Sequence, residues 1–70
     1  MKNRVTVTIA GQEYTLVGSE DAAYTQKVAA HVDAKVSEVL EGAHVSLVDG
    51  AILAAVNIAD EYFKEVETAE

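Results

Sequence analysis

The stretch of residues 51–59 most constrains the fold, because it is apolar at every position except Asn57. A helix that is apolar almost all round must be covered on more than one side. Apolar residues also recur around this stretch at alternating intervals of four and three, the heptad spacing of a helix that packs along another helix. This row consists of Val48, Ile52, Ala55, Ala59, Tyr62, Val66 and Ala69, with Leu53, Val56 and Phe63 beside it.

The size of the chain indicates what packs against this helix. Seventy residues form one small domain, whose core rarely stabilises it by more than about 3–5 kcal/mol. The sequence has no cysteine and only two histidines, which excludes disulfides and argues against a structural metal. Oligomerisation remains as the source of further stability. We therefore favour a heptad row that is shared between two copies of the chain over a heptad row that packs only in the core of one chain. The predicted dimer interface consists of Ile52, Ala55, Val56, Asn57, Ala59 and Phe63.

Asn57 has two interpretations. It is either an amide at the helix margin or a buried polar contact that fixes the register or number of the partners.

The charge balance excludes two classes of partner. Twelve acidic residues against five Lys and Arg give a net charge of −7, whereas nucleic acids and anionic membranes bind positive surfaces. The N-terminus leads directly into a strand-like run without an apolar signal segment, and no uncharged apolar run reaches 18 residues. We therefore expect a cytoplasmic protein that binds neither nucleic acid nor membrane.

The first third of the sequence predicts a β-hairpin over residues 4–17. Residues 4–9 alternate between polar and apolar side chains, as in a half-buried strand. Residues 10–12 supply a turn in which Gly11 can adopt a positive φ. The returning strand is expected to place Tyr14 and Leu16 on the buried face.

A first helix is predicted over residues 19–41, with Ser19 as its N-cap. Gly42 is expected to end it in the left-handed conformation, and the short connection that follows implies antiparallel helices. The apolar stripe expected to face the core consists of Tyr24, Val28, Val32, Val36 and Val39 or Leu40, and Ala29 widens it.

A second helix is predicted over residues 46–68, with Ser46 as its cap and Asp49 completing a weak capping box. It stops in mid-heptad without a C-cap, which indicates a truncated coiled coil from about residue 64. Gly50 is explained either by drift at an exposed position, which we favour, or by a neighbouring backbone that approaches too closely for a methyl group. The fold class is therefore α+β, one domain over residues 1–70, with a hairpin followed by two antiparallel helices.

No catalytic constellation emerges from the sequence, so we expect a protein that is not an enzyme, with no cofactor and no metal. The carboxylates of Asp60, Glu61, Glu65 and Glu67 share the outer side of a helix with Lys64, where charges are ordinarily solvated. His31 and His44 lack the spacing of metal ligands.

Three runs, residues 5–16, 28–36 and 51–62, together resemble the ZapA family of bacterial cell-division proteins. The most specific part is Ala-Ala-Val-Asn-Ile-Ala-Asp-Glu-Tyr at residues 54–62. The resemblance implies a dimerising head followed by a long coiled coil that joins two dimers into a tetramer. It also implies a partner, the tubulin-like filament protein FtsZ, whose protofilaments the family cross-links and aligns at the mid-cell division ring.

The resemblance also implies that some members of the family contact FtsZ through basic residues near the loop between the two helices. Here that loop holds Gly42, Ala43 and His44 and no Lys or Arg. A rival hypothesis is a generic acidic dimerisation head of another coiled-coil adaptor. The residues left as possible FtsZ contacts are Arg4, Lys27, Lys35, Glu38, Glu41, His44 and Asp49.

Overall fold

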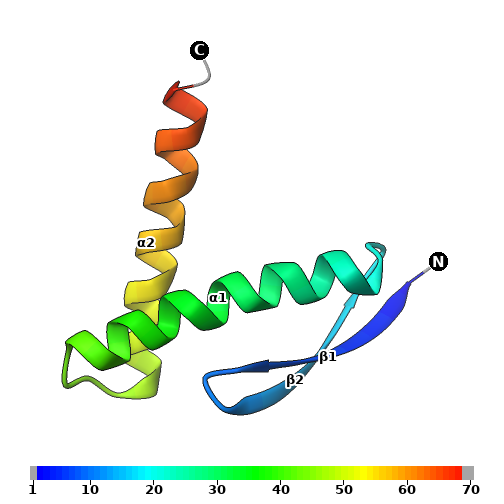
Figure 1. The fold of residues 1–70 in the computed structure, drawn as a ribbon, viewed down its shortest axis with the longest axis horizontal. Coiled ribbons are helices and arrows are strands. Elements are labelled where there is room, and N and C mark those ends of the chain that lie inside the picture. Colours follow the sequence, from blue (N-terminus) through cyan, green and yellow to red (C-terminus); the bar gives the residue numbers. More distant parts are fainter. Residues whose placement is uncertain (1, 69–70) are drawn as a thin grey trace. The chain divides into compact units, whose positions relative to one another are not determined.

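The computed structural model describes residues 2–68 and contains two strands followed by two helices (Figure 1). This order confirms the predicted α+β fold class. Strands β1 (Asn3–Ile9) and β2 (Gln12–Gly18) precede helices α1 (Ala22–Gly42) and α2 (Leu47–Thr68). The chain divides into two compact units, the first ending at Ala34 and the second beginning at Lys35, so that α1 contributes to both. Ala69, the last position of the heptad row, lies outside the described residues.

The hairpin pairs β1 with β2 in antiparallel register from Asn3 opposite Gly18 to Ile9 opposite Gln12. Its loop has two residues, Ala10 with φ of 54° and Gly11 with φ of 79°. Two successive positive φ angles define the tight turn whose twist matches that of the strands, so the predicted turn is confirmed. Only one of its two left-handed positions carries glycine. The backbone N–H of Ala10 donates to Asp33 Oδ1 at 2.7 Å, and this bond fastens the strained turn to α1.

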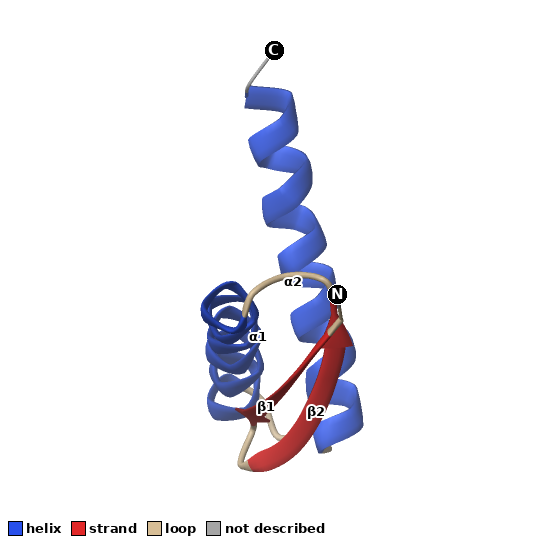
Figure 2. Ribbon diagram, turned by 90° about the vertical axis from the view of Figure 1, so that its right-hand side faces the viewer, coloured by secondary structure: helices blue, strands red, loops and turns tan. Residues whose placement is uncertain are grey.

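The core of the first unit lies between β1 and α1, which run beside each other in Figure 2. It consists of Val5, Val7 and Ala29, with Ile9 packed against them. The small side chain of Ala29 allows the helix to approach the strand. The register places Leu16 opposite Val5 and Tyr14 opposite Val7, so these side chains share the core face as predicted. The side chains of Tyr14 and Leu16 are nevertheless exposed, because α1 covers β1 and not β2.

The prediction of Ser19 as the N-cap of α1 is wrong, because Asp21 occupies that position. The N–H of Tyr24 donates to Asp21 Oδ1 at 2.8 Å, and the N–H of Thr25 donates to the carbonyl of Asp21 at 3.1 Å. Asp and Ser serve almost equally well as caps, and the two candidates lie only two residues apart. The predicted stripe is confirmed at Ala29 and Val36, which are buried, and is wrong at Tyr24 and Val28, which are exposed.

The second unit contains the end of α1, a four-residue connection and α2. Ser46 caps α2 as predicted, since its Oγ accepts from the N–H of Asp49 at 3.2 Å. The predicted left-handed conformation of Gly42 is wrong. Gly42 is the last residue of α1 and has no positive φ. The N–H of Ala43 still donates to the carbonyl of Val39 at 3.0 Å, which continues the helical ladder past Gly42.

The break between the two helices lies inside the second unit, and the chain bends there by 119°. The bend is well past a right angle, so α2 turns back against the end of α1, as the short connection predicted. Over residues 2–68, neither helix alone is long and apolar enough to cross a membrane; α1 and α2 reach that length and composition only as a bent pair.

Gly50 is buried, which overturns its explanation as drift at an exposed position. A β-carbon built on it would lie 2.7 Å from Cδ2 and 3.3 Å from Cγ of Leu40, and 3.9 Å from Cγ2 of Val45. The alternative explanation is right in that a neighbour obstructs the methyl group. That neighbour is a side chain of α1 and not another backbone.

Candidate interaction surface on the second helix

One side of α2 faces the end of α1. Gly50 lies against Leu40, Ala54 is buried, and Ile58 is half-buried. One turn further along, the carboxylate of Glu61 binds Lys35 of α1. Spacings of four, four and three residues place these positions on one side of a helix. Small residues at Gly50 and Ala54 allow the two helices to approach closely.

The opposite side of α2 carries the heptad row and is uncovered in the single chain. Ile52, Val56 and Phe63 are 58%, 60% and 61% exposed. At about 100° per residue these three point roughly 180° away from the side that faces α1. We call this side the seam, which comprises Val48, Ile52, Ala55, Val56, Ala59, Tyr62, Phe63 and Val66, all of them exposed.

The heptad row of α2 does not form the contact with α1. The contact with α1 uses Gly50, Ala54 and Glu61, none of which belongs to the row. Helix 51–59 is apolar all round because one side packs within the chain and the other is the seam. Contiguous exposed apolar surface of this kind marks interaction sites.

All six predicted interface residues are exposed in the single chain, and five of them lie on the seam. Asn57 does not, since it lies about 140° around the helix from Ile52 and next to the side that faces α1. Its role in register or partner number stays a prediction. At the far end of the seam the rings of Tyr62 and Phe63 meet edge to face, with centroids 5.3 Å apart and an interplanar angle of 73°.

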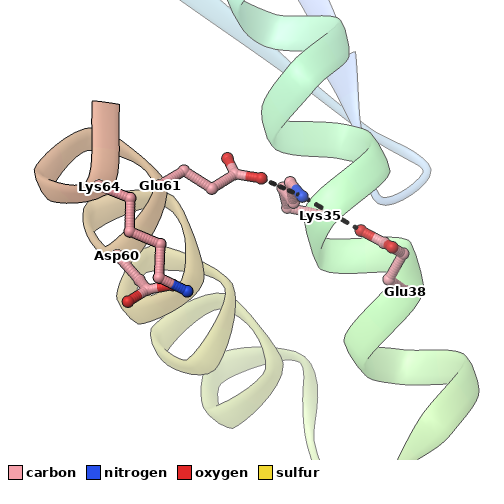
Figure 3. Close-up of polar contacts among 5 residues, drawn as sticks. All are labelled: Lys35, Glu38, Asp60, Glu61 and Lys64. Carbon is pink, nitrogen blue, oxygen red and sulfur yellow. Dashed lines mark ion pairs between the residues drawn. The ribbon is translucent and has the colours of Figure 1, made fainter. Parts of the chain in front are cut away.

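Lys35 links the two helices of the second unit (Figure 3). Its Nζ lies 2.5 Å from Glu61 Oε2 and 3.7 Å from Glu38 Oε2. The hydrogen bond that Lys35 donates to the carboxylate of Glu61 is the main cause that raises the pKa of Lys35 above its ordinary value of 10.5. Glu61 is exposed as predicted, but its carboxylate is paired with Lys35, which the sequence did not predict. Asp60 and Lys64, by contrast, form the expected exposed i,i+4 pair at 2.9 Å.

The seven possible FtsZ contacts are divided between the two units. Arg4 and Lys27 are exposed in the first unit, on β1 and on α1. Lys35 is half-buried and ion-paired, whereas the other residues of the second unit are exposed at the end of α1, in the connection and in the first turn of α2. Those exposed residues are Glu38, Glu41, His44 and Asp49.

Sequence reasoning missed the side of α2 that faces α1. Its signal was present as small residues four positions apart, Gly50 and Ala54. The heptad row of larger residues dominated the interpretation.

A small α+β module that leaves an apolar seam along its second helix has the architecture of a protein–protein interaction domain. Comparison with known proteins identifies the family: the model of "Cell division protein ZapA" matches residues 5–70, and the chain belongs to the ZapA family of cell-division proteins. The ZapA of Geobacillus thermodenitrificans is 52% identical over 64 residues, covering 90% of this chain and 70% of that protein.

Two further relatives agree with this assignment. The ZapA of Bacillus subtilis is 39% identical over 70 residues, covering 99% of this chain and 82% of that protein. A solved structure described as a ZapA mutant dimer from Geobacillus stearothermophilus has 44% identity and a TM-score of 0.78, covering 99% of this chain and 81% of that one. The likeness extends over both units of the chain.

Proposed function

We propose that this chain is a dimerising head that binds FtsZ filaments and cross-links or aligns them at the mid-cell division ring, without catalysis, in the cytoplasm. The observation that carries the proposal is the seam, an apolar helix side that the chain itself leaves uncovered. A seam with heptad spacing pairs with a second helix of the same kind. The dimeric relative from Geobacillus stearothermophilus supports a second copy as that partner.

Dimerisation supplies the proposed mechanism. One head can only decorate a filament, whereas a particle with two identical heads can bridge two filaments by multivalent binding. The relatives are longer than this chain, which covers 70% of the Geobacillus thermodenitrificans protein. An extended coiled coil would join two dimers into a tetramer and hold pairs of heads at opposite ends of a rod. We therefore expect this chain to bundle filaments less than a longer form does.

The test uses polymerised FtsZ with the chain and with Ile52→Lys, which places a charge in the middle of the seam. We expect the chain to pellet with filaments and to raise light scattering modestly, and a longer form to raise it more. Ile52→Lys should lose the scattering increase, because one head cannot bridge. Thr8→Lys, an equal charge change on the exposed outer face of the hairpin, is the matched control. Absence of the chain from the filament pellet would contradict FtsZ binding.

A further inference from the structure

Strand β2 is exposed along its whole length. All seven of its residues are exposed, whereas β1 contains two buried residues, Val5 and Val7. The sheet consists of these two strands, so each of them has one edge that no other strand pairs. An unpaired edge presents a row of backbone N–H and C=O groups to which another chain can bind. The two edges of this sheet are not equivalent.

The two-residue loop determines which backbone groups of β2 point outward. The residues that flank such a loop form a hydrogen-bonded pair, and pairs with and without backbone hydrogen bonds then alternate along the hairpin. Thr6 and Thr15 form a pair without them, in which the side chains lie close, and their Oγ1 atoms are 3.5 Å apart. The backbone N–H and C=O of Thr15 therefore point away from β1, as do those of Glu13 and Val17. We call these six groups the free edge.

The corresponding edge of β1 is occupied by α1. The outward carbonyl of Thr6 accepts a hydrogen bond from Gln26 Nε2 at 3.0 Å. At the loop, the N–H of Ala10 donates to Asp33 Oδ1 at 2.7 Å. Covering an edge strand with a helix is one of the ways in which proteins prevent it from pairing with other chains. The edge of β1 is closed in this way.

The free edge of β2 has no such protection. Within residues 2–68, no side chain or backbone group forms a hydrogen bond with the outward backbone groups of Glu13, Thr15 and Val17. The two strands pair one residue to one without a bulge, and β2 contains neither proline nor lysine. Bulges, prolines and lysines are the features that usually protect an edge strand. The free edge is therefore available to a third strand.

The side chains along the free edge indicate the chemistry of that strand. Glu13 is the only charged residue of β2, and Arg4, the only charged residue of β1, lies opposite Val17 near the other end. Opposite charges on neighbouring strands attract, and like charges repel. A basic residue is therefore favoured beside Glu13, and an uncharged residue beside Val17. On the other face, apolar residues are favoured beside the exposed side chains of Tyr14 and Leu16.

We propose that the free edge of β2 binds an extended segment of another protein as a third, antiparallel strand, with a basic residue beside Glu13. In complexes of this kind, main-chain hydrogen bonds supply affinity and alternate side chains supply specificity. A second copy of β2 fits less well, because it has no basic residue to place beside Glu13. This inference goes beyond the proposed function, since it requires neither FtsZ nor the seam.

The test uses a capped, fluorescently labelled peptide, Ser-Val-Ile-Thr-Val-Lys-Ser, whose antiparallel register places its Lys beside Glu13 and its Thr beside Thr15. N-methylation of the peptide's Thr removes an N–H that faces β2, and should weaken binding about tenfold or more by fluorescence anisotropy. N-methylation of the Val that follows this Thr removes an N–H that faces away, and should change binding less than about twofold. Equal effects of the two methyl groups, or no binding at about 1 mM peptide, would overturn the proposal.

Two measurements on the chain locate the binding. Saturating peptide should slow hydrogen exchange of the N–H groups of Glu13, Thr15 and Val17 about tenfold, whereas those of Tyr14 and Leu16, which already pair with β1, serve as internal controls. Thr15→Pro removes an N–H from the free edge alone and should abolish binding, and Thr15→Val should retain it. Circular dichroism establishes that both variants fold. Slow exchange of the three edge groups before peptide is added would overturn the proposal, because a second copy would then occupy the edge.

Discussion

Gly50 combines two opposing effects at a single position. Alanine is favoured over glycine within a helix by about 1 kcal/mol. A methyl group here would lie 2.7 Å from Cδ2 of Leu40, and forcing extra atoms into a packed contact costs about 1–3 kcal/mol. Cγ of Leu40 is also close, at 3.3 Å, so rotation of the methyl end alone does not clear the space. Packing therefore outweighs propensity.

We predict that Gly50→Ala lowers the free energy of unfolding by about 1 kcal/mol. In a Leu40→Ala background the obstruction is absent, and the same substitution should raise stability by about 1 kcal/mol. Thermal unfolding of the four proteins of this double-mutant cycle, at one protein concentration, measures both values. The same sign in both backgrounds would show that Leu40 is not the obstruction.

The ion pair of Lys35 with Glu61 makes stability depend on pH at the alkaline end. The folded chain raises the pKa of Lys35 above 10.5, chiefly through the hydrogen bond that Lys35 donates to the carboxylate of Glu61. Its contribution is therefore complete below pH 10.5 and is lost as the pH rises through the folded pKa. We predict that Glu61→Gln reduces the loss of stability above pH 10.5. Urea unfolding at pH 8 to 11 measures this, with Glu65→Gln as control, and parallel curves for Glu61→Gln and the unmodified chain would contradict it.

At the scale of the elements, the start of α1 depends on Asp21. Its carboxylate accepts from the N–H of Tyr24 at 2.8 Å and lies at the positive end of the helix dipole. We predict that Asp21→Ala costs about 1 kcal/mol of stability, whereas Ser19→Ala changes it by less than about 0.5 kcal/mol. Urea unfolding of both variants is the measurement. An equal loss from both would return a capping role to Ser19.

The order and type of all four elements were predictable, because each has a strong local signal. The alternation from Arg4 to Ile9 and the cap at Ser46 depend only on neighbouring residues. Details set by contacts distant in sequence were not predictable. The neighbour that obstructs a methyl group at Gly50 is Leu40, and the partner of Glu61 is Lys35 on α1. The cap of α1 was missed for a local reason, because Ser19 and Asp21 are nearly equal candidates two residues apart. The seam was visible in the heptad spacing, but its orientation away from α1 required the fold.

For the whole molecule, the seam is a large apolar surface to leave uncovered in a chain of 70 residues. A monomer would expose Ile52, Val56 and Phe63 to water at a cost of about 25 cal/mol for each Å² of apolar area. Its small core has little stability to spare. Folding and self-association are therefore expected to be linked, so that apparent stability rises with protein concentration.

Sedimentation equilibrium at micromolar concentration tests the central claim, the seam as a self-association surface, most directly. We predict a mass of twice 7.4 kDa for the unmodified chain and for Thr8→Lys. Ile52→Lys should lose the dimer and much of its helical structure, because a charge cannot be buried unpaired in an apolar interface. A single species of 7.4 kDa for the unmodified chain, or an intact dimer in Ile52→Lys, would contradict the account.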